Sequence, residues 1–380
     1  MNPAPAASSG APKPHIASFD KMSLNPKILR VRSSRLAEVD LDNLIFGETF
    51  SDHMFSMRYE DGRWGSPEIL PYGPVPLPPA SIALHYAQTV FEGMKAYRGA
   101  DGAIRLFRPK RNAARLRASC ERLCIPPIDD RVFVDALKAL IAVDADWVPA
   151  LPGYALYIRP VVFSTEDHIE VRPSRRYRFI VVTAPVGRYF TSGGGGLSLK
   201  VEEHYTRSPA EGGLGASKAA ANYAGTILSS EGARREGFDQ VLWLDGRERR
   251  YVEEAGLMNV FLKIAGRTVT PPIGDSILPG VTRDSLIALL RDRGVPVEER
   301  RIAIDEVLAA ARAGTLEEMF ACGTAAVVAP IANLAYRSEA IAPREAVPGP
   351  LTGALYEELT GIQFGRTADP HGWTEIVETG

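Results

Sequence analysis

Residues 95–124 read KAYRGADGAIRLFRPKRNAARLRASCERLC and join two different hydrophobic patterns. The first half alternates apolar and polar residues around a Gly-rich turn, which is typical of a β-hairpin over 95–108. The second half repeats apolar residues at helical spacing, and Pro109 suits the first turn of a helix over 108–124. A hairpin followed at once by a helix predicts an α+β fold. The apolar face of that helix consists of Ala113, Leu116, Cys120 and Leu123.

A mixture of strands and helices continues along the rest of the chain. The run TSGGGG at 191–196 interrupts it, because four successive glycines lose too much conformational entropy to hold regular structure. Beyond that run, strands and helices follow each other without strict βαβ alternation, which indicates mixed or antiparallel-rich sheets. The other expected elements are strands over 154–163, 176–186, 197–203 and 240–245, helices over 131–143 and about 219–236, and a hairpin over 256–272.

Length and the glycine run together predict two domains. The chain has 380 residues, 45% of them hydrophobic, which is enough to fill two separate cores. The first residues are rich in Pro, Ala and Ser, a composition that does not pack into a core. The expected units are a disordered tail at 1–25, a smaller N-terminal α/β domain at 26–186, a Gly-rich linker at 187–197 and a larger C-terminal domain at 198–380.

Composition argues against several classes of function. A formal net charge of −2 favours neither a nucleic-acid nor an acidic-membrane partner. Three cysteines form no disulfide framework and indicate a reducing compartment, and six scattered histidines lack the spacing of metal ligands, so we expect no bound metal. No run is apolar enough to span a membrane, and the first residues lack the features of a signal or transit peptide, so we expect a cytoplasmic protein.

Lys218 lies in the run GASKAAANYAG, between Ser217 and three alanines. It is either an exposed helix residue or a reactive amine kept away from bulky and charged neighbours. In the second case, desolvation and the positive end of a helix dipole both lower the pKa of the amine. A neutral lysine amine forms a Schiff base with an aldehyde. Tyr223, five positions on, would then hydrogen-bond a phenolate-like oxygen nearby.

Three further motifs suit the binding of charged groups. In YVEEAGLMNVF, Glu253 and Glu254 are either solvated carboxylates in a turn or supply a carboxylate aimed at a buried cationic nitrogen, such as a protonated pyridine. ILPGVTRDSL places Val281 and Thr282 at a helix N-terminus, where free N–H groups bind phosphate, although Thr282 equally suits a plain N-cap. ACGTAAVVAP contains a small-residue turn at Thr324, which is either an anion site or a chain reversal.

These motifs belong to a longer set that occurs in the order of a known family: LHYAQTVFEGMKAYRG, LFRPKRNAARL, YIRPVV, APVGRYF, SKAAANY, QVLWLDG, EAGLMNVF, ILPGVTRDSL and GTAAVVAPI. From about residue 45 to about residue 366, the chain resembles the branched-chain-amino-acid aminotransferases of the fold-type IV pyridoxal-phosphate enzymes. The larger mitochondrial-like and actinobacterial-like subgroup is the most similar. The resemblance implies a two-domain, D-amino-acid-aminotransferase-like architecture, with pyridoxal 5'-phosphate bound by the larger C-terminal domain.

The resemblance assigns a cofactor role to each charged motif. Lys218 is similar to the lysine that holds the cofactor as an internal aldimine and then moves the substrate α-proton. Glu254, rather than Glu253, resembles the carboxylate that faces the pyridine nitrogen, and Tyr223 resembles the phenol that hydrogen-bonds the ring oxygen. The residues that match the phosphate cradle are Arg108, Val281, Thr282 and Thr324.

The resemblance also implies a substrate site lined by aromatic residues. An apolar box favours Leu, Ile and Val through burial but discriminates weakly among them. Arg159 would admit the γ-carboxylate of glutamate in the second half-reaction. The groups that would hold the substrate carboxylate are Tyr86 and the amides of Thr324, Ala325 and Ala326. The residues that match the box are Phe46, Tyr86, Phe91, Tyr157 and Tyr189.

Two positions depart from the family pattern. Leu257 stands where many relatives carry a Thr three residues after the pyridine-facing Glu, which removes one hydroxyl contact near the substrate. Mitochondrial relatives carry a Cys-x-x-Cys pair where this chain has Ala326 and Ala329, so we expect no thiol switch of that kind.

The activity implied by the resemblance is transamination of branched-chain L-amino acids with 2-oxoglutarate, by a ping-pong mechanism through Lys218. The products are branched-chain 2-oxo acids and L-glutamate, as in amino-acid biosynthesis. The implied assembly is a homodimer in which Tyr86 is lent across the interface. The alternatives are another fold-type IV enzyme that acts on D-amino acids or amines or as a lyase, a catalytically silent cofactor-binding module, and a nucleic-acid binder that uses the basic helix at 108–124.

Overall fold

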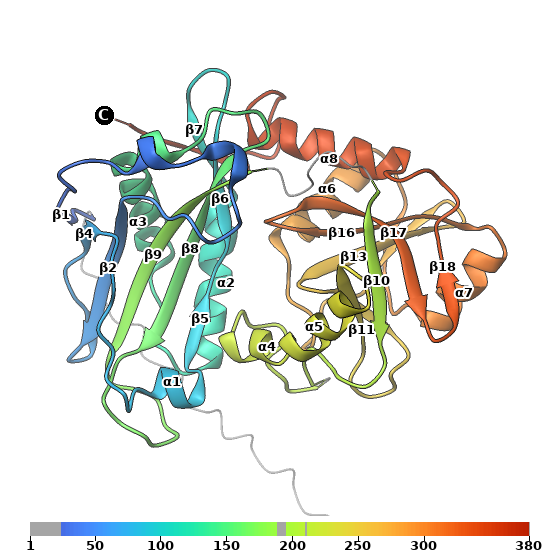
Figure 1. Ribbon diagram of the computed structural model, residues 1–380, viewed down its shortest axis with the longest axis horizontal. Coiled ribbons are helices and arrows are strands. Elements are labelled where there is room, and N and C mark those ends of the chain that lie inside the picture. The colour runs from blue at the N-terminus through green and yellow to red at the C-terminus, as the bar shows by residue number, and fades with distance from the viewer. Residues whose placement is uncertain (1–23, 188–194, 210, 380) are drawn as a thin grey trace, which may run out of the picture.

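The computed structural model describes residues 24–187, 195–209 and 211–379 of the 380-residue chain. The predicted tail at 1–25 and the predicted linker at 187–197 therefore lie mostly outside the described residues. Two halves stand side by side, each built on its own β-sheet (Figure 1). The chain passes from the first sheet to the second between β9 (Tyr177–Val186) and β10 (Leu197–Glu202).

The first sheet follows the strand order β1–β4–β2–β9–β8–β6–β7–β19, with β3 beside β2 and β5 beside β8. The hairpin predicted over 95–108 and the two predicted strands that follow it are confirmed as β6–β7, β8 and β9. The strands of this sheet besides β9 are β1 (Lys27–Ile28), β2 (His53–Glu60), β3 (Arg63–Trp64), β4 (Glu68–Pro71), β5 (Thr89–Phe91), β6 (Met94–Arg98), β7 (Ile104–Phe107), β8 (Ala155–Ser164) and β19 (Thr374–Val377).

Two amphipathic helices pack with this sheet, as their sequences predict. α2 (Pro109–Arg122) has Pro109 in its first turn. α3 (Asp130–Val143) is capped by Asp129, whose carboxylate accepts hydrogen bonds from two N–H groups of the first turn. Their apolar faces enter a hydrophobic core shared with the strands. That core includes Leu116, Cys120, Phe133, Leu137, Phe55 and Phe179.

The second sheet closes into a barrel. Its strands follow the order β12–β11–β10–β17–β16–β13, and β12 pairs with β13 as well, which completes a ring. Parallel and antiparallel pairs occur together, as predicted. The predicted hairpin is β13–β14, and both residues of its Ala265-Gly266 turn have the positive φ of a type I′ turn. The strands besides β10 are β11 (Gln240–Leu244), β12 (Val252–Ala255), β13 (Met258–Ile264), β14 (Arg267–Thr270), β15 (Val297–Glu299), β16 (Leu316–Gly323), β17 (Val327–Tyr336) and β18 (Glu339–Ile341).

Helices α6 and α8 help to join the two halves (Figure 1). Their buried residues enter a hydrophobic cluster that takes Tyr97 and Phe107 from the first sheet and Phe261 and Phe320 from the second. This shared core holds the halves in one arrangement. The helices and 3₁₀ turns not yet given bounds are α1 (Ile82–Tyr86), α4 (Ala220–Ala224), α5 (Ile227–Arg235), α6 (Val281–Asp292), α7 (Ile304–Arg312), α8 (Pro350–Gln363), and the turns Leu36–Glu38, Leu41–Asn43 and Ala145–Trp147.

The helix expected over about 219–236 is wrong in its continuity, because the structure divides it into α4 and α5. Gly225 and Thr226 separate the two helices. Glycine is a poor helix former, and the Thr226 hydroxyl donates to the carbonyl of Tyr223 at 2.7 Å, which competes with regular helical hydrogen bonding. Tyr223 therefore lies in a short helix of its own, directly after Lys218.

The C-terminal strand β19 pairs with β7 in the first sheet, although 198–380 is the range expected for the second domain. In the described ranges, no helix has the length and apolar character needed to cross a bilayer. The same ranges contain no group of three or more His, Cys, Asp or Glu side chains placed to hold a metal ion. The division into domains stays a prediction.

Candidate active site

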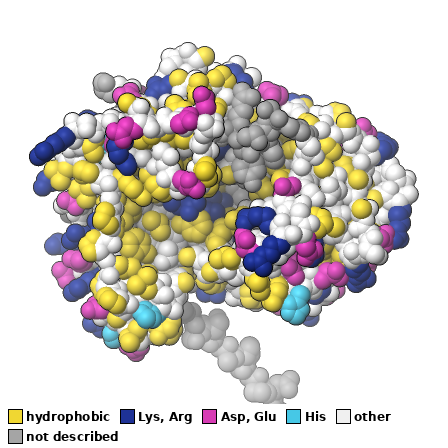
Figure 2. All heavy atoms as spheres, in the orientation of Figure 1, with side chains coloured by type: hydrophobic (Ala, Val, Ile, Leu, Met, Phe, Trp, Pro, Cys, Tyr) yellow, Lys and Arg dark blue, Asp and Glu magenta, His cyan; other side chains and the backbone are white. Residues whose placement is uncertain are grey.

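A cavity of about 770 Å³ lies between the two halves. Figure 2 shows this face of the molecule hollowed between them, with hydrophobic atoms along the hollow and Lys or Arg atoms inside it. Both sheets and the region around α4 contribute to the wall. The predicted site residues that line the cavity are Phe46, Phe91, Tyr157, Arg159, Lys218, Tyr223, Thr324 and Ala325.

Lys218 enters the cavity from the segment just before α4. Its backbone is fixed on both sides, because its N–H donates to Ser119 Oγ at 2.9 Å and its carbonyl accepts from the N–H of Phe91 at 3.1 Å. Its amine donates to the hydroxyl of Tyr223 at 3.0 Å and lies 4.9 Å from the centre of the Phe91 ring. These contacts hold the amine in place inside the cavity.

The surroundings of Lys218 favour its neutral form. Burial lowers the pKa of Lys218 to about 8, and the charge of Arg115 acts in the same direction, although Glu92 opposes it. Arg115 and the fully buried Glu92 form an ion pair, with 2.7 Å between Nε and Oε1. These two charges act on the pKa of Lys218 in opposite directions, and the loss of hydration is the largest cause of its shift. The geometry supports the reactive-amine interpretation of Lys218 over the exposed-helix interpretation.

We expect Lys218 to react with an amine-acylating reagent at a lower pH than exposed lysines do. The neutral amine is the nucleophile, so labelling of Lys218 rises with pH around a midpoint near 8. The lysine side chain in model peptides has a pKa of about 10.4. Peptide mapping of the cofactor-free chain, labelled at several pH values, measures the difference. A lysine-containing model peptide, labelled in the same mixture, serves as the reference. Equal midpoints for Lys218 and this peptide would contradict a desolvated Lys218.

Glu254 is a buried carboxylate on β12, outside the cavity lining. Its Oε1 accepts from Asn259 Nδ2 at 3.0 Å, and its Oε2 lies 2.8 Å from Nε of Arg207 without a hydrogen bond of good geometry. Burial raises the pKa of Glu254 to about 7, although the charge of Arg207 opposes this effect. The carboxylate therefore retains an oxygen that can accept a hydrogen bond. Glu253 instead accepts a hydrogen bond from the hydroxyl of Ser276.

Asn259 connects Glu254 to the start of α6. Its Nδ2 also donates to a carbonyl in the turn before α6, at 3.0 Å. Gly280 caps this helix so close to Asn259 that a Cβ at position 280 would clash with Asn259 Oδ1 and displace that side chain. The contact fixes the first helical turn, which contains Val281 and Thr282. Their N–H groups are the predicted phosphate donors, although neither residue lines the cavity.

Arg108 reaches the same helix N-terminus from the first half. It lies between β7 and α2, as its sequence position predicts, with a left-handed backbone of φ 50°. Its guanidinium donates to Asp284 Oδ2 at 2.6 Å and to Ser285 Oγ at 2.7 Å, both in α6. The structure therefore brings a cationic fork to the positive end of a helix, an arrangement that suits an anion.

Aromatic rings and one cation form the wall on the side of the first sheet. Tyr157 contacts Phe46 edge to face, with 4.9 Å between ring centroids, and Phe91 contacts Tyr223 in the same way at 4.7 Å. Arg159 Cζ lies 4.8 Å from the Phe91 ring, and its Nη2 donates to the Tyr157 hydroxyl at 2.8 Å. The Nε of Arg159 is buried without a hydrogen-bond partner, so this apolar wall keeps one unused donor.

The turn between β16 and β17 approaches the cavity from the second sheet. The Thr324 hydroxyl donates to the carbonyl of Gly93 at 3.0 Å, and Lys95 donates to the carbonyl of Ala325 at 2.7 Å. Both bonds tie the turn to the first half. Because its hydroxyl proton points at Gly93, Thr324 has only its backbone N–H to offer an anion in this arrangement.

Two predicted substrate residues lie outside the cavity wall. Tyr86, at the end of α1, is 46% exposed and does not line the cavity of its own chain. Ala326 is buried and also absent from the wall, and Tyr189 lies outside the described residues. Leu257, one of the two departures from the family pattern, does line the cavity.

Sequence reasoning missed several buried charges that organise the site. Arg207 pairs with Glu254, and Lys95 reaches a turn far along the chain. Glu92 and Arg115 form the ion pair beside Lys218. The local signals are weak, because a charge between apolar residues is also common on exposed strands and helices.

A family model matches most of the chain. The sequence model of the family called amino-transferase class IV matches residues 89–334, more than half of the chain, and this range contains Lys218 and Glu254. The chain belongs to the class IV aminotransferases. The aminotransferase therefore has the fold-type IV architecture that its sequence predicts, and the two sheets described above are its framework.

The aminotransferase is similar to relatives that share one name. It is 45% identical over 350 residues to branched-chain-amino-acid aminotransferase 2 of Bacillus subtilis (strain 168). The aligned region covers 92% of this chain and 96% of the relative. It is 48% identical over 357 residues to the branched-chain-amino-acid aminotransferase of Mycobacterium tuberculosis (strain CDC 1551 / Oshkosh), with coverages of 92% and 95%. The solved structure of the T.th. branched-chain amino acid aminotransferase with pyridoxamine 5'-phosphate matches with a TM-score of 0.70 and 27% identity, over 85% of this chain and 98% of that one.

Proposed function

We propose that this aminotransferase transfers the amino group of Leu, Ile and Val to 2-oxoglutarate, with pyridoxal 5'-phosphate as cofactor. The names of its relatives support the substrates, and the pyridoxamine 5'-phosphate of the T.th. structure supports the cofactor. The observation that carries the proposal is the amine of Lys218, which has a pKa lowered to about 8 and lies in a cavity walled by aromatic rings.

The residues around the cavity fit this cofactor. The buried Oε2 of Glu254, which has no hydrogen-bond donor, is the acceptor that a protonated ring nitrogen needs. When bound, the cofactor supplies an aldehyde that carries the amino group and a ring that withdraws electrons from the substrate α-carbon. The residues that would hold it are Lys218 at the aldehyde, Tyr223 at the ring oxygen, Glu254 at the ring nitrogen, and Arg108, Val281, Thr282 and Thr324 at the phosphate.

Lys218 performs the proton transfer in this mechanism. Its amine takes the proton from the α-carbon of the amino acid, and in the second half-reaction it returns a proton to the α-carbon of the oxo acid. The lowered pKa leaves enough of the amine neutral for this role near physiological pH. The hydrogen bond to Tyr223 orients the amine between the two steps.

The aromatic wall explains a preference for branched aliphatic side chains. Burying such a side chain against Phe46, Phe91 and Tyr157 stabilises the complex by about 1.5–3 kcal/mol, and Leu, Ile and Val differ by one methylene at most. Leu257 adds apolar surface where many relatives carry a hydroxyl. Arg159, with its unused Nε donor, would hold the γ-carboxylate of glutamate.

The position of Tyr86 supports the further proposal of a homodimer. This residue is half-exposed and lies outside its own cavity, so that it is free to complete a second one. In the dimer, Tyr86 of the partner subunit and the amides of the turn at Thr324 would hold the substrate carboxylate. The cytoplasmic location stays a prediction from sequence.

A substrate comparison tests the proposed activity. The purified enzyme is assayed with 2-oxoglutarate and each of L-Leu, L-Ile, L-Val and D-Ala, and formation of L-glutamate is measured. We expect turnover of the three branched L-amino acids, with rates within about 200-fold of one another because at most a single methylene separates them. An enzyme that prefers D-Ala would instead carry out the other fold-type IV reaction. A chain that binds the cofactor but turns over none of the four would be a silent binding module.

A further inference from the structure

The segment after α8 returns from the second half to the first. Its strand β19 pairs antiparallel with β7, with Thr374 opposite Phe107 and Val377 opposite Ile104. Figure 1 shows this end of the chain beside β7. Because β7 ends at Phe107, the returning segment lies next to Arg108, the predicted phosphate ligand.

Trp373, just before β19, contacts Arg108 through both its backbone and its ring. The carbonyl of Trp373 accepts from the N–H of Arg108 at 2.7 Å, and the guanidinium Cζ lies 4.9 Å from the indole centroid. The two terminal nitrogens of the guanidinium, Nη1 and Nη2, donate hydrogen bonds to Ser285 and Asp284 of α6. Arg108 has a left-handed backbone, which a residue other than glycine keeps only when its surroundings fix it.

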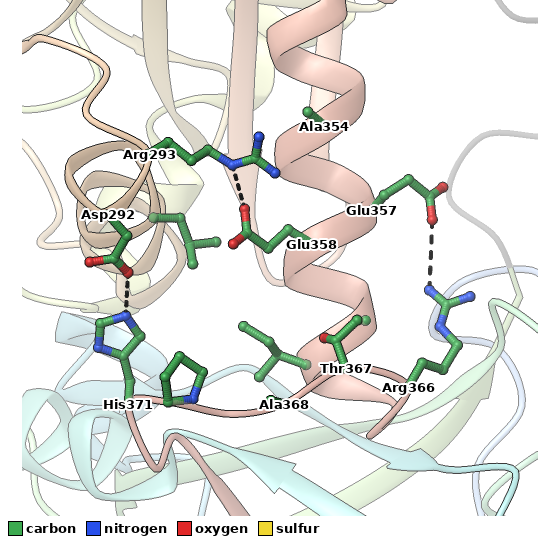
Figure 3. A pocket seen from close by; sticks show the side chains of 13 residues that line it. Asp292, Arg293, Ala354, Glu357, Glu358, Arg366, Thr367, Ala368 and His371 are labelled. Carbon is green, nitrogen blue, oxygen red and sulfur yellow. Dashed lines mark hydrogen bonds and ion pairs between the residues drawn. The ribbon is translucent and has the colours of Figure 1, made fainter.

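The same segment also contacts the far end of α6. His371 stacks on Trp373, with 4.2 Å between ring centroids, and its Nε2 lies 2.6 Å from Asp292 Oδ2. Figure 3 shows His371 directed at Asp292, the last residue of α6. The charged groups labelled in that pocket form ion pairs with one another, so we assign it no ligand. Its role is to join α6, α8 and the returning segment.

We propose that Trp373 is a positioning residue, which holds the guanidinium of Arg108 against the N-terminus of α6 and so sets the affinity of the enzyme for the phosphate group of its cofactor. This inference rests on the proposed function, since it needs pyridoxal phosphate as the ligand. A free arginine side chain loses much rotamer freedom when it binds an anion. The indole face and α6 restrict Arg108 before the phosphate arrives, so less freedom is lost on binding.

Two aldehydes separate this effect from general damage to the site. The full-length chain, freed of cofactor, is titrated with pyridoxal 5'-phosphate and with pyridoxal, which lacks the phosphate, and binding is followed by visible absorbance. For Trp373→Leu we expect binding of pyridoxal phosphate to weaken about tenfold, with unchanged binding of pyridoxal. Trp373→Phe keeps an aromatic face and should recover most of the loss.

Matched variants keep the test decisive. Val377→Ala removes buried packing from the same strand without touching Arg108, so it should lower the melting temperature and leave the ratio of the two affinities unchanged. If Trp373→Leu does not fold, Ser285→Ala removes another restraint on the same guanidinium and should shift the ratio in the same direction.

Three results would overturn the inference. Equal losses for both aldehydes, or no loss for either, would show that Trp373 does not act through the phosphate. The third result applies if Trp373→Leu does not fold. It is a Ser285→Ala variant in which the ratio of the affinities for pyridoxal phosphate and pyridoxal is the same as in the wild type. A wild-type chain that binds neither aldehyde would instead reject the proposed function itself, and this inference with it.

Discussion

Lys218→Ala is expected to lower transamination of L-leucine by about 10³-fold or more, because it removes the residue that we propose as both the attachment point of the cofactor and the base that moves the α-proton. The loss should fall on kcat, since the aromatic wall and the phosphate-binding groups remain. The variant should still bind pyridoxal phosphate, but without a covalent bond. Coupled measurement of glutamate formation and borohydride reduction followed by peptide mapping check these two expectations.

Lys95→Met is the matched control for this prediction. Lys95 is also buried, and burial lowers its pKa to about 8, but its amine donates to the carbonyl of Ala325 instead of facing Tyr223. Borohydride should therefore fix the cofactor to Lys218 in both the wild type and Lys95→Met. A label found on the Lys95 peptide, or an active Lys218→Ala enzyme, would rule out the mechanism.

Glu254→Gln should have the second largest effect, a loss of about 10²–10³-fold in kcat, comparable to removing one preorganised charge-stabilising group. The Oε2 of the carboxylate has no hydrogen-bond donor and is the acceptor that we propose for a cationic ring nitrogen, whereas an amide carries no charge to keep that nitrogen protonated. The substitution also leaves Arg207 without its buried counter-charge. The visible spectrum of the bound cofactor and the steady-state rate both report the change.

Glu253→Gln isolates the effect of position from that of charge. Glu253 is the neighbouring residue and is also buried, but it is bonded to Ser276 and is not the carboxylate paired with Arg207. It should keep most of the activity while Glu254→Gln loses it. If both variants lose activity to the same extent, the assignment of Glu254 alone to the ring nitrogen fails.

Local patterns predicted the elements of this fold better than its connections. The hairpin at 95–108 and the helix after it have strong periodicities and match β6, β7 and α2 closely. The division of the helix follows from the poor helix propensity of Gly225 together with the hydroxyl bond of Thr226, and hydrophobic periodicity reveals neither effect. The return of β19 to β7 joins segments far apart in sequence, and Trp373 alone gives no sign of its partner.

The sequence was informative about the candidate site where a functional residue has unusually small neighbours, as Lys218 does. The alanines around Lys218 left two interpretations open, an exposed helix residue or a desolvated amine, and burial lowers the pKa of Lys218 as the second interpretation expects. Arg207 left no such signal in the sequence, because its partner Glu254 lies on a distant strand. The family resemblance predicted a phosphate-binding role for the guanidinium of Arg108. Its contacts with α6 were not predictable, because they depend on the core that packs the two halves together.

The pairing of β19 with β7 has a consequence for synthesis of the protein. β7 leaves the ribosome early, but its partner strand follows only after the whole barrel and α8. At roughly 5–20 residues per second, β7 presents an open strand edge for on the order of ten seconds or more. Exposed edges pair readily with other chains, so nascent copies are most prone to aggregate during that interval. Synthesis of β19 then covers this edge of β7, and β19, a strand of four residues, becomes the outer strand of the sheet.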